Sequence, residues 1–298
     1  MLSIKLLFLV FFATIQSSFS SAQAEFSESK ESPYYNLNLI ENEDISPNNC
    51  AFSTVCGEIL NSTGGVISYR VFQNLVPNER CVWIIRGGNP SGYNIHVREV
   101  GFSRNNYDTQ ITATCFSKGS QPFHRDISEP DLHSVSSCDV LMITFHSSDY
   151  VGGYTGFMLE YNVQLIGGGN SVSRNSTDFI LDRDFSVLHH PNASALYSND
   201  EVSLFVFVPS NNIFSPNKKT NLLFMEESLE ACCDLVNLFV FMGNSNNQIK
   251  WEWQETLLGN RTIVSNSDLA VLEFTTDSSV VRSGFQLVLA REGNECEH

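Results

Sequence analysis

Two pairs of aspartates occupy matching places in the chain and offer the clearest chemistry in the sequence. Asp149 and Asp277 each lie seven residues before a Gly-Phe pair that begins an apolar segment. Asp108 lies 41 residues before Asp149, and Asp234 lies 43 residues before Asp277. Carboxylates that a fold brings together repel one another unless a cation neutralises them, so the question is whether the fold brings each pair together. The alternative is that each aspartate bonds its own backbone as a turn residue.

Signatures of catalysis are missing from the same sequence. No histidines are spaced as in HExxH and no serine lies in a GxSxG elbow, which are the patterns of zinc proteases and of many hydrolases. The adjacent residues His189 and His190 would point to opposite faces of a strand, so they would not share a metal ion. These absences remove two common signatures of enzymes and do not by themselves disprove catalysis.

The elements that must position these aspartates have the texture of β-strands. From Cys50 onward, short segments rich in Val, Ile, Phe and Tyr are separated by clusters of Gly, Asn, Pro and Ser. This pattern predicts all-β sandwiches. Glycine and serine in residues 165–177 predict a linker, so we expect one domain over residues 50–164, a second over 178–292, and a polar tail over 293–298. The repeated aspartate spacing indicates that the two domains are copies of one fold.

The first residues have the layout of an export signal. Residues 1–24 combine a lysine, an apolar run and a final Ala-Gln-Ala, which is typical of a secretory signal peptide, and residues 25–49 predict an acidic flexible leader. No later stretch approaches the roughly 20 apolar residues of a membrane-spanning helix. Four glycosylation sequons agree with export, at Asn61, Asn175, Asn192 and Asn260. We expect a secreted, extracellular glycoprotein without a membrane span.

The charge balance narrows the choice of partners. The chain carries 17 basic and 33 acidic residues, a formal net charge of −16 at pH 7. Binding to nucleic acids or to anionic membranes relies on a basic surface, so we expect neither. An acidic surface suits a cation or a basic partner, although it also serves solubility alone.

Four motifs occur in the order found in CUB domains, which are extracellular jelly-roll β-sandwiches. These motifs are the Cys-Gly of Cys56, the CVWII that begins at Cys81, the Tyr-Asp pair that ends at Asp108, and the segment from Phe145 to Tyr161 with its Gly-Phe pair. Residues 50–163 therefore resemble a CUB domain. The second copy is less similar, because Val202 stands where the CxW motif would begin. The resemblance implies two tandem CUB-like jelly-roll antiparallel β-sandwiches, the second of them divergent.

The same resemblance implies two disulfides. The family usually joins its Cys-Gly cysteine to its CxW cysteine, which here are Cys56 and Cys81. A bond of this span stabilises a fold by roughly 3 kcal/mol. The second family bridge implies a displaced bond between Cys115 and Cys138, because Asn105 stands where the family has a cysteine.

Four of the eight cysteines then remain, namely Cys50, Cys232, Cys233 and Cys296. Direct bonding of the neighbours Cys232 and Cys233 would close a strained eight-membered ring. We therefore expect each of them to pair with Cys50 or Cys296. The alternative is that Cys50 pairs elsewhere or with another chain.

Many CUB domains are similar in binding calcium through a glutamate about eight residues before the Tyr-Asp aspartate, that aspartate, and the aspartate before the Gly-Phe strand. By this resemblance the first copy supplies Asp108 and Asp149 but has Val100 at the glutamate position. The second copy supplies the whole set Glu226, Asp234 and Asp277, with Glu227 and Glu230 as neighbouring alternatives. Calcium takes six to eight oxygen ligands, which carboxylates, loop carbonyls and water can provide. The resemblance thus implies Ca²⁺ as a cofactor, with the better site in the second copy.

These expectations lead to a function. We expect a secreted, non-catalytic recognition protein that binds an extracellular protein or glycan through its CUB loops, with calcium shaping at least one of them. Two alternatives stay open, a self-associating structural or surface-coat protein and a regulatory partner of a separate extracellular protease. The sequence names neither the ligand nor the oligomeric state.

Overall fold

The computed structural model describes most of the chain between residues 50 and 292. The described residues are 50–87, 90–103, 109–165, 175–191, 195–215, 219–242, 250–265 and 267–292. The predicted signal peptide, leader and tail, and most of the predicted linker, lie outside these residues. Within the described ranges the only helix is the short 3-10 turn η1 (Ser210–Asn212), and no helix there is long and apolar enough to cross a bilayer.

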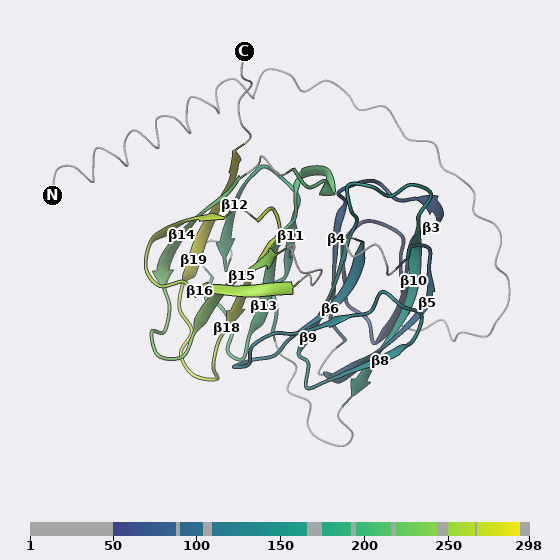
Figure 1. Ribbon diagram of the computed structural model, residues 1–298. Coiled ribbons are helices and arrows are strands. Elements are labelled where there is room, and N and C mark those ends of the chain that lie inside the picture. The colour runs from purple at the N-terminus through teal and green to yellow at the C-terminus, as the bar shows by residue number, and fades with distance from the viewer. Residues whose placement is uncertain are drawn as a thin grey trace, which may run out of the picture. The chain divides into compact units, whose positions relative to one another are not determined.

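The strands before residue 166 form two five-stranded sheets of a first β-sandwich (Figure 1). One sheet has the order β1 (Cys50–Ser53), β3 (Gly64–Asn74), β10 (Thr155–Leu165), β5 (Pro90–Val100) and β8 (Leu132–Ser136). The other has the order β2 (Glu58–Leu60), β4 (Arg80–Ile85), β9 (Val140–His146), β6 (Gln110–Phe116) and β7 (Phe123–Asp126). All neighbouring strands are antiparallel except β1 with β3 and β2 with β4.

The strands after residue 178 form a second β-sandwich of two sheets. One sheet has the order β11 (Phe179–Leu181), β13 (Val202–Phe207), β18 (Ala270–Thr275), β15 (Leu235–Met242) and β16 (Lys250–Thr256). The other has the order β12 (Phe185–His190), β19 (Gly284–Glu292), β14 (Lys219–Ser228) and β17 (Arg261–Ser265). The prediction of an all-β chain with tandem, mainly antiparallel sandwiches is confirmed.

The second sandwich repeats the first strand by strand. The order β2-β4-β9-β6-β7 returns as β11-β13-β18-β15-β16, and the order β3-β10-β5-β8 returns as β12-β19-β14-β17. Among the described residues only β1 has no counterpart. Asp277 lies between β18 and β19, and Asp149 holds the same place between β9 and β10. Asp234 directly precedes β15, which is the counterpart of β6. The repeat that the aspartate spacing predicted is therefore a repeat of the fold.

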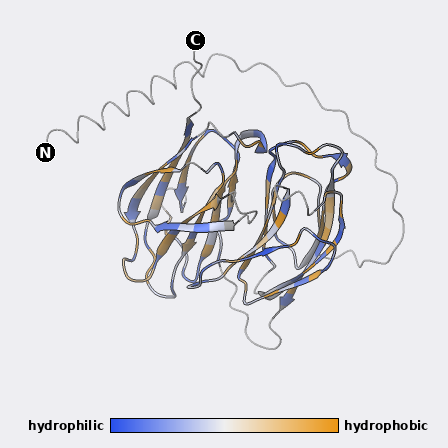
Figure 2. Ribbon diagram, in the orientation of Figure 1, coloured by the Kyte–Doolittle hydropathy of each residue, from blue (hydrophilic) through white to orange (hydrophobic). Residues whose placement is uncertain are grey.

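Each sandwich encloses a core built from alternate residues of its strands. Trp83 of β4 and Phe205 of β13 are fully buried in the two cores. Their neighbours Ile84 and Val206 point to the other side of the same sheets, yet they are also fully buried. A strand that is covered on both faces can be apolar throughout, and β4 and β13 are buried along their whole length. Figure 2 shows hydrophobic and hydrophilic residues interspersed along the strands.

The outer faces of these two sheets share a third apolar cluster. Val82, Ile84 and Phe116 of the first sandwich belong to it together with Val206 and Phe239 of the second. The ring centroids of Phe116 and Phe239 lie 5.7 Å apart in an edge-to-face arrangement, which aromatic pairs favour. The two sandwiches therefore pack against each other through apolar side chains, which the sequence did not predict.

Polar side chains also join the two sandwiches. The Arg86 guanidinium donates hydrogen bonds to both oxygens of the Asp178 carboxylate and to the main-chain carbonyl of Val202. The Lys118 ammonium lies 3.1 Å from a carboxylate oxygen of Asp200. A bidentate arginine pair fixes orientation as well as distance, so it sets how the residue directly after β4 faces the residue directly before β11.

Candidate cation-binding site

Three carboxylates meet at one end of the second sandwich. Glu230 and Asp234 lie in the connection between β14 and β15, and Asp277 lies in the loop between β18 and β19. One carboxylate oxygen from each residue lies within 4.8 Å of the other two. We call Glu230, Asp234 and Asp277 the acidic cluster. Asp234 and Asp277 are two of the aspartates that the sequence predicted as ligands.

Asp234 anchors the acidic cluster. Its side chain is buried, and its carboxylate accepts hydrogen bonds from the main-chain N–H groups of Glu230 (3.2 Å) and Asp277 (3.3 Å). The Tyr197 hydroxyl donates a further bond to it. Burial, and then this bond to a carboxylate, raise the pKa of Tyr197 above its usual range, so the hydroxyl remains a donor. Asp234 thereby ties the β14–β15 connection to the β18–β19 loop.

Ser279 links the other two members of the cluster. Its hydroxyl lies 2.7 Å from a carboxylate oxygen of Asp277 and 3.1 Å from one of Glu230. Its main-chain N–H also donates to Asp277, at 2.8 Å. The hydroxyl bond, followed by the main-chain bond, lowers the pKa of Asp277, so this carboxylate is ionised at neutral pH. The sequence held no specific signal for Tyr197 or Ser279.

The arrangement of these oxygens suits a hard cation such as Ca²⁺. Two ligand oxygens that each lie about 2.4 Å from one calcium ion are at most about 5 Å apart. The separation within the acidic cluster stays inside that limit. A cation would also relieve the repulsion between the carboxylates. Since calcium takes six to eight oxygens, main-chain carbonyls and water would complete the shell.

Glu226 does not lie in the acidic cluster, although the family spacing placed it there. Its carboxylate accepts a hydrogen bond from the main-chain N–H of Gly259 (2.6 Å), and its own N–H donates to the Asn260 side chain (3.1 Å). The pairing of β14 with β19 shifts register between Glu226 and Ser228. Counting residues along the strand therefore does not predict which acid lies in the cluster after the turn. Glu230, one of the neighbouring alternatives, lies in the cluster instead.

The matching site in the first sandwich lies only partly within the described residues. Asp108 lies outside the described residues. Asp149 is exposed in the connection between β9 and β10. The residues next to these two aspartates are in contact, because the Ser148 N–H donates to the Thr109 hydroxyl at 3.1 Å. Asp108 and Asp149 therefore stay predicted ligands.

The cysteines agree with the predicted pairing in the first sandwich and differ from it in the second. The structure contains both the Cys56–Cys81 and the Cys115–Cys138 disulfides.

The expectation that Cys232 and Cys233 bond to distant partners is wrong, because these neighbours bond to each other. They lie in a turn directly before Asp234, where both side chains come from one tight bend. Cys50 is exposed and unbonded within the described part of the chain, and Cys296 lies outside it.

Three of the four predicted glycosylation asparagines fall in described segments. Asn61, Asn175 and Asn260 are exposed, which is what a glycan acceptor requires. Asn192 lies outside the described residues. Glycosylation itself stays a prediction for all four.

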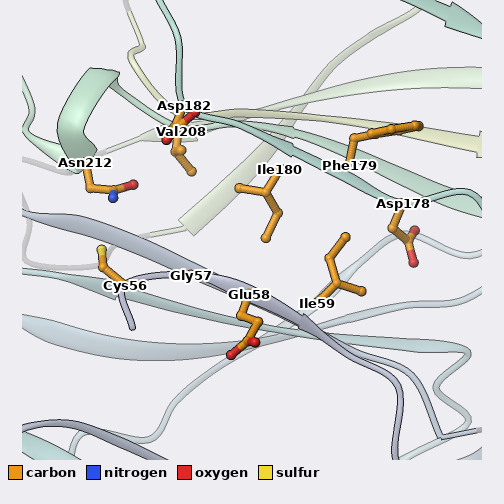
Figure 3. Close-up of a pocket in the computed structure, with 10 residues that line it drawn as sticks. All are labelled: Cys56, Gly57, Glu58, Ile59, Asp178, Phe179, Ile180, Asp182, Val208 and Asn212. Carbon is orange, nitrogen blue, oxygen red and sulfur yellow. The ribbon is translucent and has the colours of Figure 1, made fainter. Parts of the chain in front are cut away.

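An open cavity of about 390 Å³ lies between β2 and β11, which are edge strands of their sheets. Figure 3 shows Ile59 and Ile180 on opposite sides of it, with Asp182 toward one end and Asp178 toward the other. Arg86 already engages the Asp178 carboxylate, so this acid is committed to the contact between the sandwiches. None of the predicted metal ligands that the structure describes lines the cavity.

Comparison with known proteins gives distant likenesses. No protein-family model matches the chain, and no curated protein matches it. The chain is similar to the solved CUB1-EGF-CUB2 domain of human MASP-1/3, with 13% identity and a TM-score of 0.31 over 78% of this chain and 100% of that one. The CUB1-EGF-CUB2 domains of rat MASP-1 give 12% identity and a TM-score of 0.29, over 78% and 99%.

The full extracellular region of zebrafish Gpr126/Adgrg6 gives 13% identity and a TM-score of 0.30, over 82% of this chain and 34% of that one. Identities and TM-scores this low do not establish a family.

Proposed function

We propose that this protein is an extracellular, non-catalytic recognition protein of CUB type, whose acidic cluster binds calcium and whose neighbouring loops bind a protein or glycan. The observation that carries the proposal is the meeting of Glu230, Asp234 and Asp277 from two separate loops. The CUB motifs of the first copy and the strand-by-strand repeat support the family assignment. The net charge of −16 favours a basic partner.

The members of the acidic cluster have different roles in this proposal. Asp234 is buried and holds the two loops together, whereas Glu230 and Asp277 are partly exposed. Calcium would supply the positive charge that lets the three carboxylates stay close. Glu230 and Asp277 can then turn their remaining oxygens toward a lysine or arginine of a protein partner, or toward the hydroxyls of a glycan.

Calcium titration of the full chain by calorimetry tests the cation site. Extracellular calcium modules bind with dissociation constants on the order of 0.1–1 mM, so we expect an affinity in that range. An Asp234→Asn, Asp277→Asn double variant should lose the binding, because it removes two charges with little change in shape. Glu226→Gln is the matched control, since Glu226 is an acid of β14 outside the cluster, and it should bind as the original chain does.

Two results would contradict the assignment of the site. Binding that survives in the double variant would move the site elsewhere, and an additional Asp149→Asn variant would test the first sandwich. Loss of calcium binding in Glu226→Gln alone would show that Glu226 is a ligand, as the family spacing predicted. Thermal unfolding in excess chelator must show that each variant is folded.

The recognition step needs its own measurement. Arrays of extracellular proteins and of glycans, probed with the purified chain in calcium and in chelator, should give signals that require calcium. The same signals should fall in the double variant and persist in Glu226→Gln. Binding that is equal with and without calcium would separate recognition from the acidic cluster.

A further inference from the structure

Two ionisable side chains are buried where the sandwiches pack against each other. Glu273 lies on β18 of the second sandwich and is 2% exposed, and His146 lies on β9 of the first and is 7% exposed. Neither belongs to the acidic cluster. Buried ionisable groups resist the charged form unless a partner compensates, so their surroundings decide how the contact responds to pH.

Glu273 points toward the first sandwich, where its carboxylate has almost no hydrogen-bond partners. Its neighbours in β18, Leu272 and Phe274, fill the core of the second sandwich, so strand alternation turns Glu273 to the other face. On that face the Asn237 amide donates a single bond to it at 3.3 Å. Its other carboxylate oxygen is buried and has no hydrogen-bond partner among the described residues.

The groups around Glu273 are apolar, neutral or negative. Its partner on β13 is Leu204, which belongs to the shared apolar cluster, and its partner on β15 is the neutral Asn237. The nearby group from the first sandwich that affects it is the acid Asp139, while Lys118 is paired with Asp200. Burial raises the pKa of Glu273 from 4.5 to about 7, and Asp139 adds to the shift against the opposing effect of Asn237.

His146 is held in its neutral form by resisting a proton, whereas Glu273 is held neutral by keeping one. Its ring meets the ring of Phe241 in the second sandwich at 5.9 Å, and its Nδ1 is buried with no hydrogen-bond partner within the described segments. Its partner on β4 is Arg80, and its partner on β6 is the neutral Gln110. Burial, and then the charge of Arg80, hold the pKa of His146 well below 6.5.

Arg80 also belongs to the contact between the sandwiches. Its guanidinium lies over the rings of Phe214 and Phe241 and 4.0 Å from the Asp268 carboxylate. It therefore keeps its charge next to His146 throughout the range in which His146 would be protonated.

We propose that the contact between the two sandwiches is a pH-sensitive joint, which Glu273 weakens in neutral and alkaline solution and His146 weakens in acid. A Glu273 carboxylate that loses its proton gains hydration when the sandwiches separate. A His146 ring gains a proton more easily in water than beside Arg80. The joint is therefore tightest when Glu273 is protonated and His146 is neutral.

The direction of each effect follows from proton uptake. Glu273 holds a proton in the packed state up to about pH 7 and in the separated state only up to about pH 4.5, so packing weakens as pH rises through that window. His146 takes up a proton below pH 6.5 in the separated state but not in the packed state, so packing weakens as pH falls below 6.5. Each effect changes the equilibrium up to about tenfold per pH unit.

The two effects oppose each other between pH 4.5 and 6.5. In that range the stability of the original chain should change little with pH, whereas the stability of each single variant should change. Unfolding by urea should be followed from pH 4.5 to 8.5 for the full-length Glu273→Gln and His146→Gln variants. Glu273→Gln should have a higher midpoint than the original chain at pH 8, and its midpoint should rise from pH 4.5 to 6.5. His146→Gln should show a midpoint that falls from pH 5 to 7.

Exposed residues provide matched controls. Glu129→Gln and His189→Gln remove the same groups from exposed positions, and their profiles should follow that of the original chain. Asp268 has its pKa raised by burial and acts in the same direction as Glu273, but it is present in every variant and does not affect the differences between them.

A second comparison shows whether the two sandwiches face each other at Glu273. Asp139→Asn removes an acid of the first sandwich that raises the pKa of Glu273. The pH range in which Glu273 affects stability should therefore end at a lower pH in this variant. The same change in the Glu273→Gln background should leave the shape of the profile unaltered. Profiles that run parallel in all variants, or an Asp139→Asn effect that is the same in both backgrounds, would overturn the proposal.

Discussion

The main-chain N–H of Asp277 donates a hydrogen bond to the carboxylate of Asp234, 43 residues earlier in the chain, at 3.3 Å. This bond joins the loop between β18 and β19 to the connection between β14 and β15. Glu230 and Ser279 complete the link, because the Ser279 hydroxyl lies within hydrogen-bond distance of both Glu230 and Asp277. The acidic cluster is therefore a bonded unit rather than a chance gathering of surface acids.

Tyr197→Phe should destabilise the chain by about 1–3 kcal/mol, because it leaves a buried carboxylate oxygen of Asp234 without its hydroxyl donor. Urea unfolding in chelator measures this loss. Tyr161→Phe is the matched control, since the Tyr161 hydroxyl lies 2.6 Å from the uncharged Ser62 hydroxyl, and its cost should be about 1 kcal/mol. Equal costs for the two variants would contradict a special role for the Tyr197 bond.

Arg86→Ala should cost about 3–5 kcal/mol, because it strands the buried Asp178 carboxylate in the contact between the sandwiches. Arg98→Ala removes an arginine from an exposed pair with Glu160 and should cost about 0–1 kcal/mol. Chemical denaturation of both variants gives the comparison. Similar small losses would mean that the sandwiches do not pack at Arg86.

Phe116→Ala and Phe239→Ala should each cost about 3–5 kcal/mol, because both rings are buried in the shared apolar cluster. The double variant should cost less than the sum by about 0.5–1.5 kcal/mol, since the two rings contact each other. Equilibrium unfolding of the original chain and the three variants gives the double-mutant cycle that measures this difference. Strict additivity would show that the rings do not meet.

Removing the Cys56–Cys81 disulfide by a double alanine change should cost about 3 kcal/mol, because this bond closes a separation of 25 residues. Removing the Cys232–Cys233 disulfide in the same way should cost much less, since adjacent residues are already held together by the chain. Mass spectrometry of unreduced peptides checks the pairing first. Recovery of Cys232 bonded to Cys50 or Cys296 would contradict it.

The strands and the repeat could be predicted because they rest on local patterns. Apolar segments of strand length between turn clusters specify sheets, and the matching places of Asp149 and Asp277 before a Gly-Phe pair mark equivalent loops. Two of the three members of the acidic cluster followed from the same spacing. Glu230 was harder to identify than Glu226, because the register shift and the turn after β14 determine which acid reaches Asp234.

The contact between the sandwiches could not be read from the sequence for a physical reason. Val82 and Ile84 continue the apolar run of β4, and a run of this kind shows that a strand is covered on both faces without showing what covers it. The same limit applies to Glu273, whose burial depends on strands far away in the chain. Ion pairs such as Arg86 with Asp178, 92 residues apart, also have no local signal.

Amide hydrogen exchange of the full chain, with and without calcium, tests the central claim most directly. If calcium binds the acidic cluster and orders its loops, residues 230–234 and 277–283 should become protected together. That protection should be absent in the Asp234→Asn, Asp277→Asn variant and present in Glu226→Gln. Exchange that is the same in both segments with and without calcium would contradict the account.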